Sequence, residues 1–428
     1  MTPEEQKSQS KRAPWTVWAY IWTTYPKSFL TCYAIEYFNT GFRQILILGY
    51  LYRFKGYYSL SPAQVTQYSA ILSLPWTPKL VYGFITDTFP IFGSRKKAYL
   101  ILAGLLQFGT LLTISFPIEN VGFFVGMVWI SEFCGAVMDV VVDGLMVIQQ
   151  RRDPNAGSED LQSFSWSMYG IGGISGALAG GYLTDADNEL WCFAVRACVG
   201  LLMAIAACFI TKAVEMDAEE RVQASLWTRV KANCTDVYRG TVRTPELYKA
   251  LLFFIVLGCA VPSYEDYLYY YQVDITGFTQ IQYSYLKVIT YVVLFLSAAA
   301  YGSLFGGVSV RIMLFAAICI NIFGCLTTVM FCTGHTIGIP PYAFVCMTGT
   351  VMSEIYSAYT SLPSGITFSK LIPEDVEASM FAMLTGLLNF ANLFAAKEVA
   401  LGLNNFVGVY YESETDNNLD EVWKLYCV

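Results

Sequence analysis

The sequence predicts an all-α, polytopic membrane protein, and three observations support this prediction. Of the 428 residues, 55% are hydrophobic and only 14% are charged, which is far from the composition of a soluble domain. The apolar stretches reach about 20 residues, the length a helix needs to cross a hydrocarbon core of about 30 Å. Basic residues lie mostly in every second gap between these stretches, with 18 of the 26 in one set of gaps and three in the other. Because cytoplasmic loops retain Lys and Arg, the N-terminus is expected on the cytoplasmic or matrix-equivalent side of a membrane that the sequence does not identify.

Eleven apolar stretches are predicted to span the membrane, one fewer than the twelve expected of two six-helix bundles. They cover residues 29–52, 62–85, 97–117, 121–149, 159–183, 191–214, 247–273, 278–304, 309–332, 339–369 and 375–398. Spanning β-strands are not expected, because the stretches are too long and lack alternation with a period of two. After residue 405 the chain becomes polar, and residues 419–428 look like the approach to a twelfth span. The sequence leaves open whether that span is lost or lies outside the chain given.

The longest polar interruption, residues 212–249, separates six predicted spans from five. Two helical bundles joined in this way are typical of transporters built from repeats. The predicted segments are a cytoplasmic N-terminal segment (1–28), a six-helix bundle (29–214), a cytoplasmic linker (215–246), a five-span bundle (247–400), and a non-cytoplasmic tail or approach to the missing span (401–428).

Several classes of function are not expected. The twelve cysteines show no C-x-x-C spacing and the single histidine, His335, lies in a predicted outer loop, so neither a metal site nor a cofactor is predicted. No residues form a recognisable nucleophile–base pair, so an enzyme is not expected. The net charge of −7 gives no nucleic-acid footprint. The expected partners are the lipid bilayer and a small-molecule substrate.

The second predicted span and the loop after it carry the strongest local pattern. Pro75 and Pro78 each remove a helical hydrogen bond, so this span should bend. Gly83 permits close helix approach near the cytoplasmic end, and Asp87 and Arg95 flank a short inner loop. This pattern is similar to the signature loop of the major facilitator superfamily, where it forms a cytoplasmic gate closed by charge pairing. The alternative is an ordinary basic loop on the cytoplasmic side.

The fourth predicted span contains two carboxylates, Asp139 and Asp143, whose spacing of four places them on one helix face. A charged group at membrane depth costs about 3 kcal/mol even on lenient insertion scales, and such groups are usually functional. Two close acids also differ in proton affinity, so one can hold a proton, which suits proton coupling. The alternative is a structural pair bound to Lys79, Lys287 or Arg43.

Other charged residues also lie within predicted spans. Lys287 falls about ten residues into the eighth span, and Lys79 lies near the inner end of the second. Glu36 and Arg43, seven residues apart, share one face of the first span. Together these residues predict a polar core of both signs at the interface of the two bundles, where transporters bind their substrates.

The fifth predicted span contains a row of glycines at a spacing of four, namely Gly172, Gly176 and Gly180. Small residues in such a row allow two helices to approach closely within lipid. The row is therefore expected to serve architecture first.

These motifs, in this order, resemble the folate–biopterin transporter family of the major facilitator superfamily from about residue 29 to residue 425. The resemblance implies a major facilitator-type two-bundle fold. It also implies transport of folate, a pterin or an S-adenosylmethionine-like substrate by alternating access coupled to protons. The stretches that carry it are Pro75-Trp76-x-x-Lys79 … Gly83 … Asp87 … Gly93 … Arg95, Asp139-Val140-Val141-Val142-Asp143-Gly144-Leu145, Asp160-Leu161-Gln162-Ser163 … Trp166, and Leu371-Ile372-Pro373 … Asn389.

The resemblance also suggests roles for individual residues. A pterin ring offers an amine and a ring N–H that suit the carboxylate of Asp139 or Asp143. Folate's glutamate carboxylates suit Lys79, Lys287 or Arg43. The ring of Trp166 or Tyr267 can stack on the flat pterin. The predicted substrate-binding residues are Asp139, Asp143, Lys79, Lys287, Gln162, Trp166, Glu36 and Arg43, and the predicted gate residues are Gly83, Asp87 and Arg95.

The sequence also departs from the family pattern. Leu80 replaces a usual proline, Gln149 stands where an acid is common, and Arg43, Glu265 and Asp266 are unusual at their positions. These departures and the missing span motivate an alternative function, a degenerate carrier retained as a structural subunit of a larger membrane complex.

Overall fold

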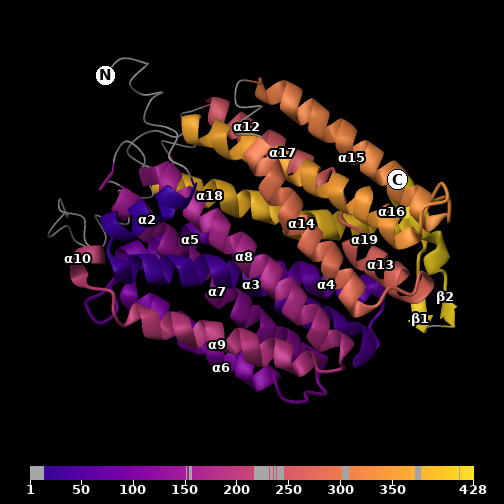
Figure 1. Cartoon of the computed structure of the whole chain (residues 1–428), viewed down its shortest axis with the longest axis horizontal. Helices are drawn as coiled ribbons and strands as arrows, with labels where there is room; N and C mark the ends of the chain where they lie inside the picture. The colour runs from indigo at the N-terminus through magenta and orange to yellow at the C-terminus, as the bar shows by residue number, and fades with distance from the viewer. Residues whose placement is uncertain are drawn as a thin grey trace.

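A computed structural model of the chain describes residues 14–150, 152–153, 157–215, 245–300, 308–371, 377–413 and 415–428, together with residues 231, 235 and 238. The described chain is mostly helical, and its long helices run roughly along the longest axis of the molecule (Figure 1). The predicted linker at 215–246 lies almost entirely outside the described residues.

Each predicted span corresponds to one helix or to a run of interrupted helices. The first half contains α2 (Pro14–Thr24), α3 (Lys27–Gly56), α4 (Pro62–Ser73), the 3₁₀ turn η1 (Leu74–Trp76), α5 (Lys79–Thr88), α6 (Lys97–Ile114), α7 (Val121–Gln150), α8 (Gly157–Asp185), α9 (Glu189–Ala207) and α10 (Lys212–Glu215).

The second half is more interrupted than the first. It contains α12 (Pro245–Cys259), α13 (Glu265–Tyr270), the π-helical turn η2 (Tyr271–Ile275), α14 (Gln280–Ala300), α15 (Val310–Cys332), α16 (Pro341–Met347), α17 (Gly349–Leu371), α18 (Glu377–Asn389), the π-helical turn η4 (Phe390–Ala395) and α19 (Ala396–Val407). The chain then forms β1 (Tyr411–Ser413), β2 (Asp416–Asn417) and the short 3₁₀ helix η5 (Leu419–Cys427).

Four of the described helices are long and apolar enough to cross a membrane by length and composition alone. They are α6, α7, α9 and α15. Several other predicted spans are broken, at prolines between α4 and α5 and at π-helical turns after α13 and α18. The count of eleven spans therefore remains a prediction.

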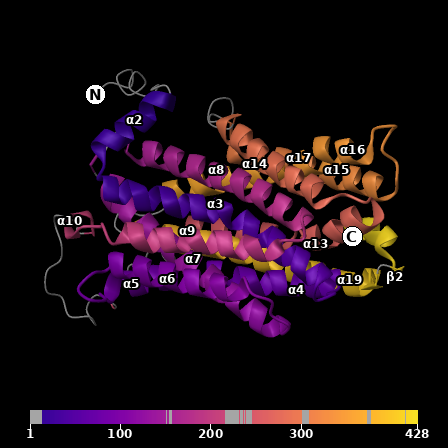
Figure 2. The ribbon, with the colours of Figure 1, turned by 60° about the horizontal axis from the view of Figure 1, so that its bottom comes forward.

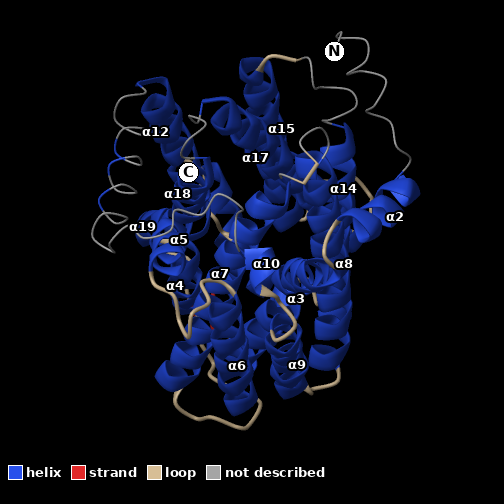
Figure 3. Ribbon diagram, turned by 90° about the vertical axis from the view of Figure 1, so that its left-hand side faces the viewer, coloured by secondary structure: helices blue, strands red, loops and turns tan. Residues whose placement is uncertain are grey.

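The helices of each half pack mainly on one another. In the first half α3 packs against α8 and α9, and α6 lies between α7 and α9; in the second half α17 contacts α14 and α15. Figure 3 shows α12, α15, α17 and α18 above and α3, α6, α7 and α9 below. The halves meet where α8 contacts α14, where α5 contacts α18 and where α4 contacts α19.

The two ends of the molecule carry different elements. Figure 2 shows α2 and α10 at one end, and α13, α19 and the C-terminal elements at the other. Strands β1 and β2 form a small antiparallel hairpin, and η5 packs on α15 through buried Leu419, Val422 and Leu425. Residues 419–427 thus cover the end of the second half as a short helix.

The glycine row of α8 lies against α3, which confirms the expected close approach. A Cβ added at Gly176 would lie 2.9 Å from the carbonyl oxygen of Phe42, and Gly172 and Gly180 also face α3 backbone atoms. From the other side, Gly41 of α3 faces a backbone carbonyl of α8. The two helices therefore touch along their backbones, as small residues allow.

The predicted bend of the second span is also confirmed. Helix α4 ends at Ser73, a 3₁₀ turn follows, and α5 begins at Lys79, directly after Pro78. Since prolines lack the N–H of a regular helix, they interrupt the hydrogen bonding there. The interruption leaves Trp76 and Lys79 buried between α7 and the second half.

Candidate substrate-binding site

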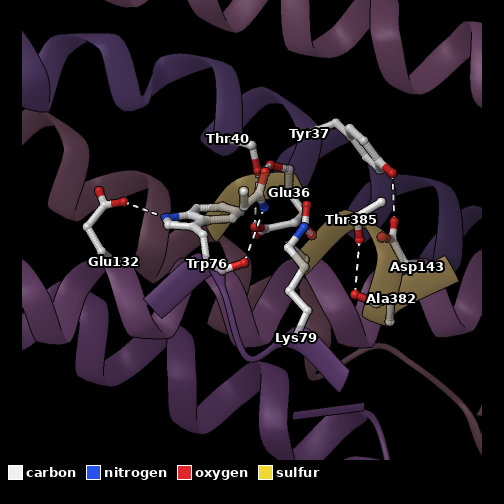
Figure 4. Close-up of polar contacts among 11 residues, drawn as sticks. Glu36, Tyr37, Thr40, Trp76, Lys79, Glu132, Asp143, Ala382 and Thr385 are labelled. Atoms are coloured by element: carbon white, nitrogen blue, oxygen red, sulfur yellow. Dashed lines mark hydrogen bonds and ion pairs between the residues drawn. The ribbon is translucent and has the colours of Figure 1, made fainter. Parts of the chain in front are cut away.

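The carboxylate of Asp139 forms an ion pair with Lys79. The Lys79 Nζ to Asp139 Oδ2 distance is 2.6 Å, and the two side chains are 11% and 9% exposed. The ammonium group also lies 5.2 Å from the centroid of the Trp76 ring, within the range of a cation–π contact. The bend before α5 places Lys79 beside Asp139 of α7, and Figure 4 shows the Lys79 side chain among the neighbouring polar residues. Of the three cations proposed as structural partners, Lys79 is therefore the one that contacts Asp139.

The carboxylate of Asp143 has a neutral partner. The Tyr37 hydroxyl of α3 donates a hydrogen bond of 2.6 Å to Asp143 Oδ1 (Figure 4). Asp143 is half-buried, whereas Asp139 is buried. The two acids of α7, one turn apart, thus differ in both accessibility and partner: one is matched by a cation and the other by a phenol.

A third acid of α7, Glu132, organises a neighbouring cluster. Its Oε2 atom lies 2.5 Å from Arg43 Nε and accepts a 2.7 Å hydrogen bond from Trp76 Nε1. The Arg43 guanidinium also lies 5.6 Å from the centroid of the Trp76 ring. Glu132 was absent from the predicted site, although its spacing of seven from Asp139 places both on one helix face.

The predicted neighbours Glu36 and Arg43 have separate partners. Glu36 is 1% exposed; the Thr40 hydroxyl lies 3.4 Å from its Oε1 atom, and no described residue bonds its Oε2 atom. Arg196 of α9, also missed, is 1% exposed and lies within electrostatic range of Glu36 and Glu132. Two of its nitrogens, Nε and Nη1, have no hydrogen-bond partner among the described residues. The first half therefore holds more buried charge than its predicted site residues suggested.

Lys287 belongs to a different cluster, in the second half. It forms an ion pair with Glu265 of α13, and its ammonium lies 5.2 Å from the centroid of the Tyr283 ring. A second pair lies beside it, between Asp266 and Lys397, with 2.6 Å between Oδ2 and Nζ. These charges of both signs form separate ion pairs, and Lys287 pairs with Glu265 rather than with either aspartate of α7.

The predicted residues of α8 lie near the junction of the two halves. Trp166 is 51% exposed, and its ring packs edge-on against Tyr169 at 5.6 Å between centroids. Tyr169 in turn lies 5.7 Å from Tyr291 of α14. Gln162 is half-buried, and its backbone carbonyl accepts a hydrogen bond from Ser165. The aromatic contacts therefore connect α8 to the second half.

The predicted gate is described only in part. A Cβ added at Gly83 would lie 3.4 Å from a Val140 side-chain atom of α7, so this glycine faces α7 at ordinary contact distance. Arg95 is half-buried in the loop between α5 and α6, and the side chain of Asp87 lies outside the described residues. Glu215 of α10 accepts a 2.6 Å hydrogen bond from the Ser94 hydroxyl, which ties this loop to the start of the predicted linker. Charge pairing between Asp87 and Arg95 remains a prediction.

The second half contacts the first directly at the bend. The Asn389 side-chain amide donates a 3.2 Å hydrogen bond to the backbone carbonyl of Trp76. Gly386 of α18 packs on the carbonyl of Thr77, and a Cβ there would lie 3.6 Å from Lys79 N. Figure 4 also shows α18, with Thr385, beside Lys79. The Lys79–Asp139 pair is therefore beside the junction of the two halves.

The described part of the chain contains no group of three His, Cys, Asp or Glu residues that could hold a metal ion. Its buried charges instead form salt bridges and hydrogen bonds to tyrosine, tryptophan and threonine. Such an arrangement can bind a polar, flat molecule through charge-assisted hydrogen bonds and ring stacking.

Comparison of the sequence with those of known proteins gives folate and folate-biopterin transporters. A folate-biopterin transporter of Synechocystis sp. is 27% identical over 384 residues, which cover 89% of this chain and 75% of that protein. Folate transporter 1 of Plasmodium falciparum is 22% identical, with 83% of this chain and 69% of that protein covered. The resemblance to folate–biopterin transporters is thus confirmed.

Solved structures show the same overall fold. The nucleoside transporter NupG superposes with a TM-score of 0.67 at 11% identity, covering 94% of this chain and 96% of that one. A D-xylose-proton symporter superposes with a TM-score of 0.64 at 12% identity, covering 93% and 94%. These similarities establish a major facilitator-type fold.

The family match extends over nearly the whole chain. The relatives and structural neighbours are transporters and not enzymes, and they indicate an integral, multi-pass membrane protein. A family model described as the BT1 family matches residues 40–427, and the chain belongs to that family.

Proposed function

We propose that this protein is a secondary active transporter that moves folate, a pterin or a related metabolite by alternating access, in symport with protons. The observation that carries the proposal is the Lys79–Asp139 ion pair, buried at the bend where α18 of the second half packs on α5. Buried charge at the junction of two helical halves is where such carriers bind substrate. The names of the relatives supply the substrate class.

Asp143 is the proposed acceptor for the amine and ring N–H of a pterin. It is more accessible than Asp139, and its hydrogen-bond partner is a neutral phenol. Lys79, a cation within electrostatic range of Asp143, already forms its ion pair with Asp139. A carboxylate without an ion-pair partner of its own is costly at membrane depth, so binding of a donor-rich ring or of a proton would relieve that cost. The same carboxylate thereby links substrate binding to proton binding.

The remaining predicted residues keep proposed roles around this acid. Trp166 is 51% exposed and packs on Tyr169, which contacts Tyr291 of α14, and it is proposed to provide a face for ring stacking. Glu36, Arg43 and Gln162 are proposed to shape the same polar region. We further propose that Gly83, Asp87 and Arg95 form the cytoplasmic gate.

The two halves, 29–214 and 247–400, are proposed to rock against each other with the N-terminus on the cytoplasmic or matrix-equivalent side. The comparisons do not favour the alternative of a degenerate structural subunit of a larger complex. The names of the relatives describe carriers of small molecules.

Uptake into proteoliposomes tests the proposal. Radiolabelled folate and biopterin should accumulate above the level of empty vesicles, and an inward proton gradient should increase the rate. Asp143→Asn should abolish uptake, whereas Asp416→Asn, in the exposed C-terminal hairpin, should leave it unchanged. Absence of uptake of both compounds would refute the substrate class. A rate that ignores the proton gradient would refute the symport, and full uptake by Asp143→Asn would exclude that residue from the mechanism.

A further inference from the structure

Three cations were candidates for a substrate's anionic group, and each has an acidic partner. The side chain of Asp139, the partner of Lys79, is 9% exposed. The side chain of Glu132, the partner of Arg43, is 1% exposed. The partner of Lys287, Glu265, is 55% exposed, while Lys287 itself is 18% exposed. A water-exposed carboxylate can leave its lysine more readily than a buried one. The displaced charge must be hydrated, and a buried carboxylate has no water to hydrate it.

Glu265 nevertheless has charged and polar groups of several helices near it. It lies within electrostatic range of Lys397 on α19, Glu354 on α17 and Tyr50 on α3, in addition to Lys287 on α14. Groups from four helices, one of them in the first half, therefore surround this side chain. Its side chain is therefore exposed although charged and polar groups of both halves lie within electrostatic range of it.

The neighbouring acid, Asp266, provides the contrast. It is 4% exposed and pairs with Lys397 at 2.6 Å. Breaking such a sealed pair would leave a buried charge without a partner, so Asp266 is held in place by its surroundings. Two acids adjacent in the sequence thus hold their lysines in different ways, because Glu265 is exposed and Asp266 is buried.

We propose that Glu265 is an exchangeable counter-ion, which holds Lys287 when no substrate is bound and yields it to a carboxylate of the substrate. The exchange replaces one carboxylate by another, so Lys287 is never left without a partner at membrane depth. Glu265 moves into the accessible space as the substrate enters. Because the inference names the anion subsite of the transported molecule, it rests on the proposed function.

The exchange makes a prediction that depends on the ligand. A ligand with a carboxylate must displace Glu265, whereas a pterin without one need not. Removing the charge of Glu265 should therefore strengthen binding of ligands that carry a carboxylate and leave binding of a pterin without one unchanged. Removing the charge of Lys287 should weaken binding only of the ligands that carry a carboxylate.

Binding to the purified full-length chain in detergent tests this inference, with folate, p-aminobenzoylglutamate and biopterin as probes. Glu265→Gln should lower the Kd of folate and p-aminobenzoylglutamate by about tenfold, because the Glu265 carboxylate no longer competes with the ligand for Lys287. A tenfold change in Kd corresponds to about 1.4 kcal/mol. The Kd of biopterin should change by less than about twofold, which is under 0.4 kcal/mol. Lys287→Met should raise the Kd of the two carboxylates by at least tenfold, and Lys287→Arg should restore their binding. Asp266→Asn, the matched control, should not shift the ratio of folate to biopterin affinity.

The outcomes separate the two proposals. If the wild-type protein binds none of the three probes, the proposed function fails and this inference fails with it. If the wild type binds them and Glu265→Gln weakens folate, or changes all three Kd values alike, the function stands and the counter-ion role is overturned. If Lys287→Met does not fold, Glu265→Gln and Lys287→Arg still decide the question, because both retain a polar side chain at the pair.

Discussion

Replacing Lys79 by methionine isolates the charge of the buried ion pair. Methionine keeps much of the side-chain volume but leaves Asp139 without its cation. The pair is 2.6 Å long, and its side chains are 11% and 9% exposed, so little water can compensate for the lost charge. Removing one partner of a buried pair costs about 3–5 kcal/mol, a large share of a net stability of about 5–15 kcal/mol. Lys79→Met should therefore lower the apparent Tm strongly.

Removing both charges should cost less than removing one. In the Lys79→Met/Asp139→Asn protein no uncompensated charge remains, and buried pairs are often replaced by neutral side chains with little loss. The coupling energy between the two sites should be about 2 kcal/mol or more, within the range of contacting residues. Lys79→Arg, which keeps the charge, serves as the control.

Thermal unfolding in detergent, followed by tryptophan fluorescence, measures these effects. Additive losses in the double variant would refute the reasoning, because they would show that the two groups do not stabilise each other. Folate uptake then separates the two interpretations of the pair. Recovered stability with recovered uptake means that the pair is structural, and recovered stability without uptake means that its charges act in transport.

Three further predictions follow from other contacts. Gly176→Ala should lower the apparent Tm, because the added Cβ and the α3 backbone must move apart by about 0.5 Å. Such overpacking lowers the free energy of unfolding by about 1–3 kcal/mol. Gly170→Ala, on the same helix with no atom within 4 Å of the added Cβ, should leave the Tm unchanged or raise it. Trp76→Phe removes a 2.7 Å hydrogen bond to a buried carboxylate and should lower the free energy of unfolding by about 1.5–3 kcal/mol. The apparent Tm should fall accordingly, and Trp76→His should restore part of it. Lys55→Gln and Asp274→Asn each break a 2.5 Å ion pair between the halves and should speed amide hydrogen exchange in residues 271–275. Equal exchange in the two variants and the wild type would show that the pair does not stabilise this turn.

Local features of the fold could be predicted from the sequence. The two prolines at 75 and 78 interrupt hydrogen bonding wherever the chain lies, so the bend before α5 was predictable. The glycine row of α8 was predictable for a similar reason, because small residues at a spacing of four share a helix face. Neither feature depends on which helices are neighbours.

The partners of the charged residues were harder to predict. A spacing of four or seven shows which residues share a face, but not which helix that face meets. Glu36 and Arg43 share a face of α3, yet Arg43 bonds Glu132 while Glu36 is bonded by Thr40. Lys287 likewise found its partner on α13, a short helix that the sequence did not separate from the rest of its span.

Glu132 could have been found by the same rule that identified Asp139 and Asp143. All three lie on one face of α7, since their positions differ by seven and four. Arg196 gave a weaker signal, an isolated cation within a predicted span. Its nearness to Glu36 and Glu132 depends on the packing of α9 beside α3, which no local pattern fixes.

The π-helical turns at 271–275 and 390–395 affect any alignment of the two halves. Each wide turn inserts one extra residue, and one residue of an α-helix corresponds to about 100° of rotation. The first-half helices at the corresponding positions in the order of spans, α3 and α8, are continuous over 30 and 29 residues. Under the predicted pairing of the two halves as repeats, a residue-by-residue superposition therefore slips out of phase after each insertion. A gap of one position is required there, and it changes which residue of α19 is the structural equivalent of a given residue in α8.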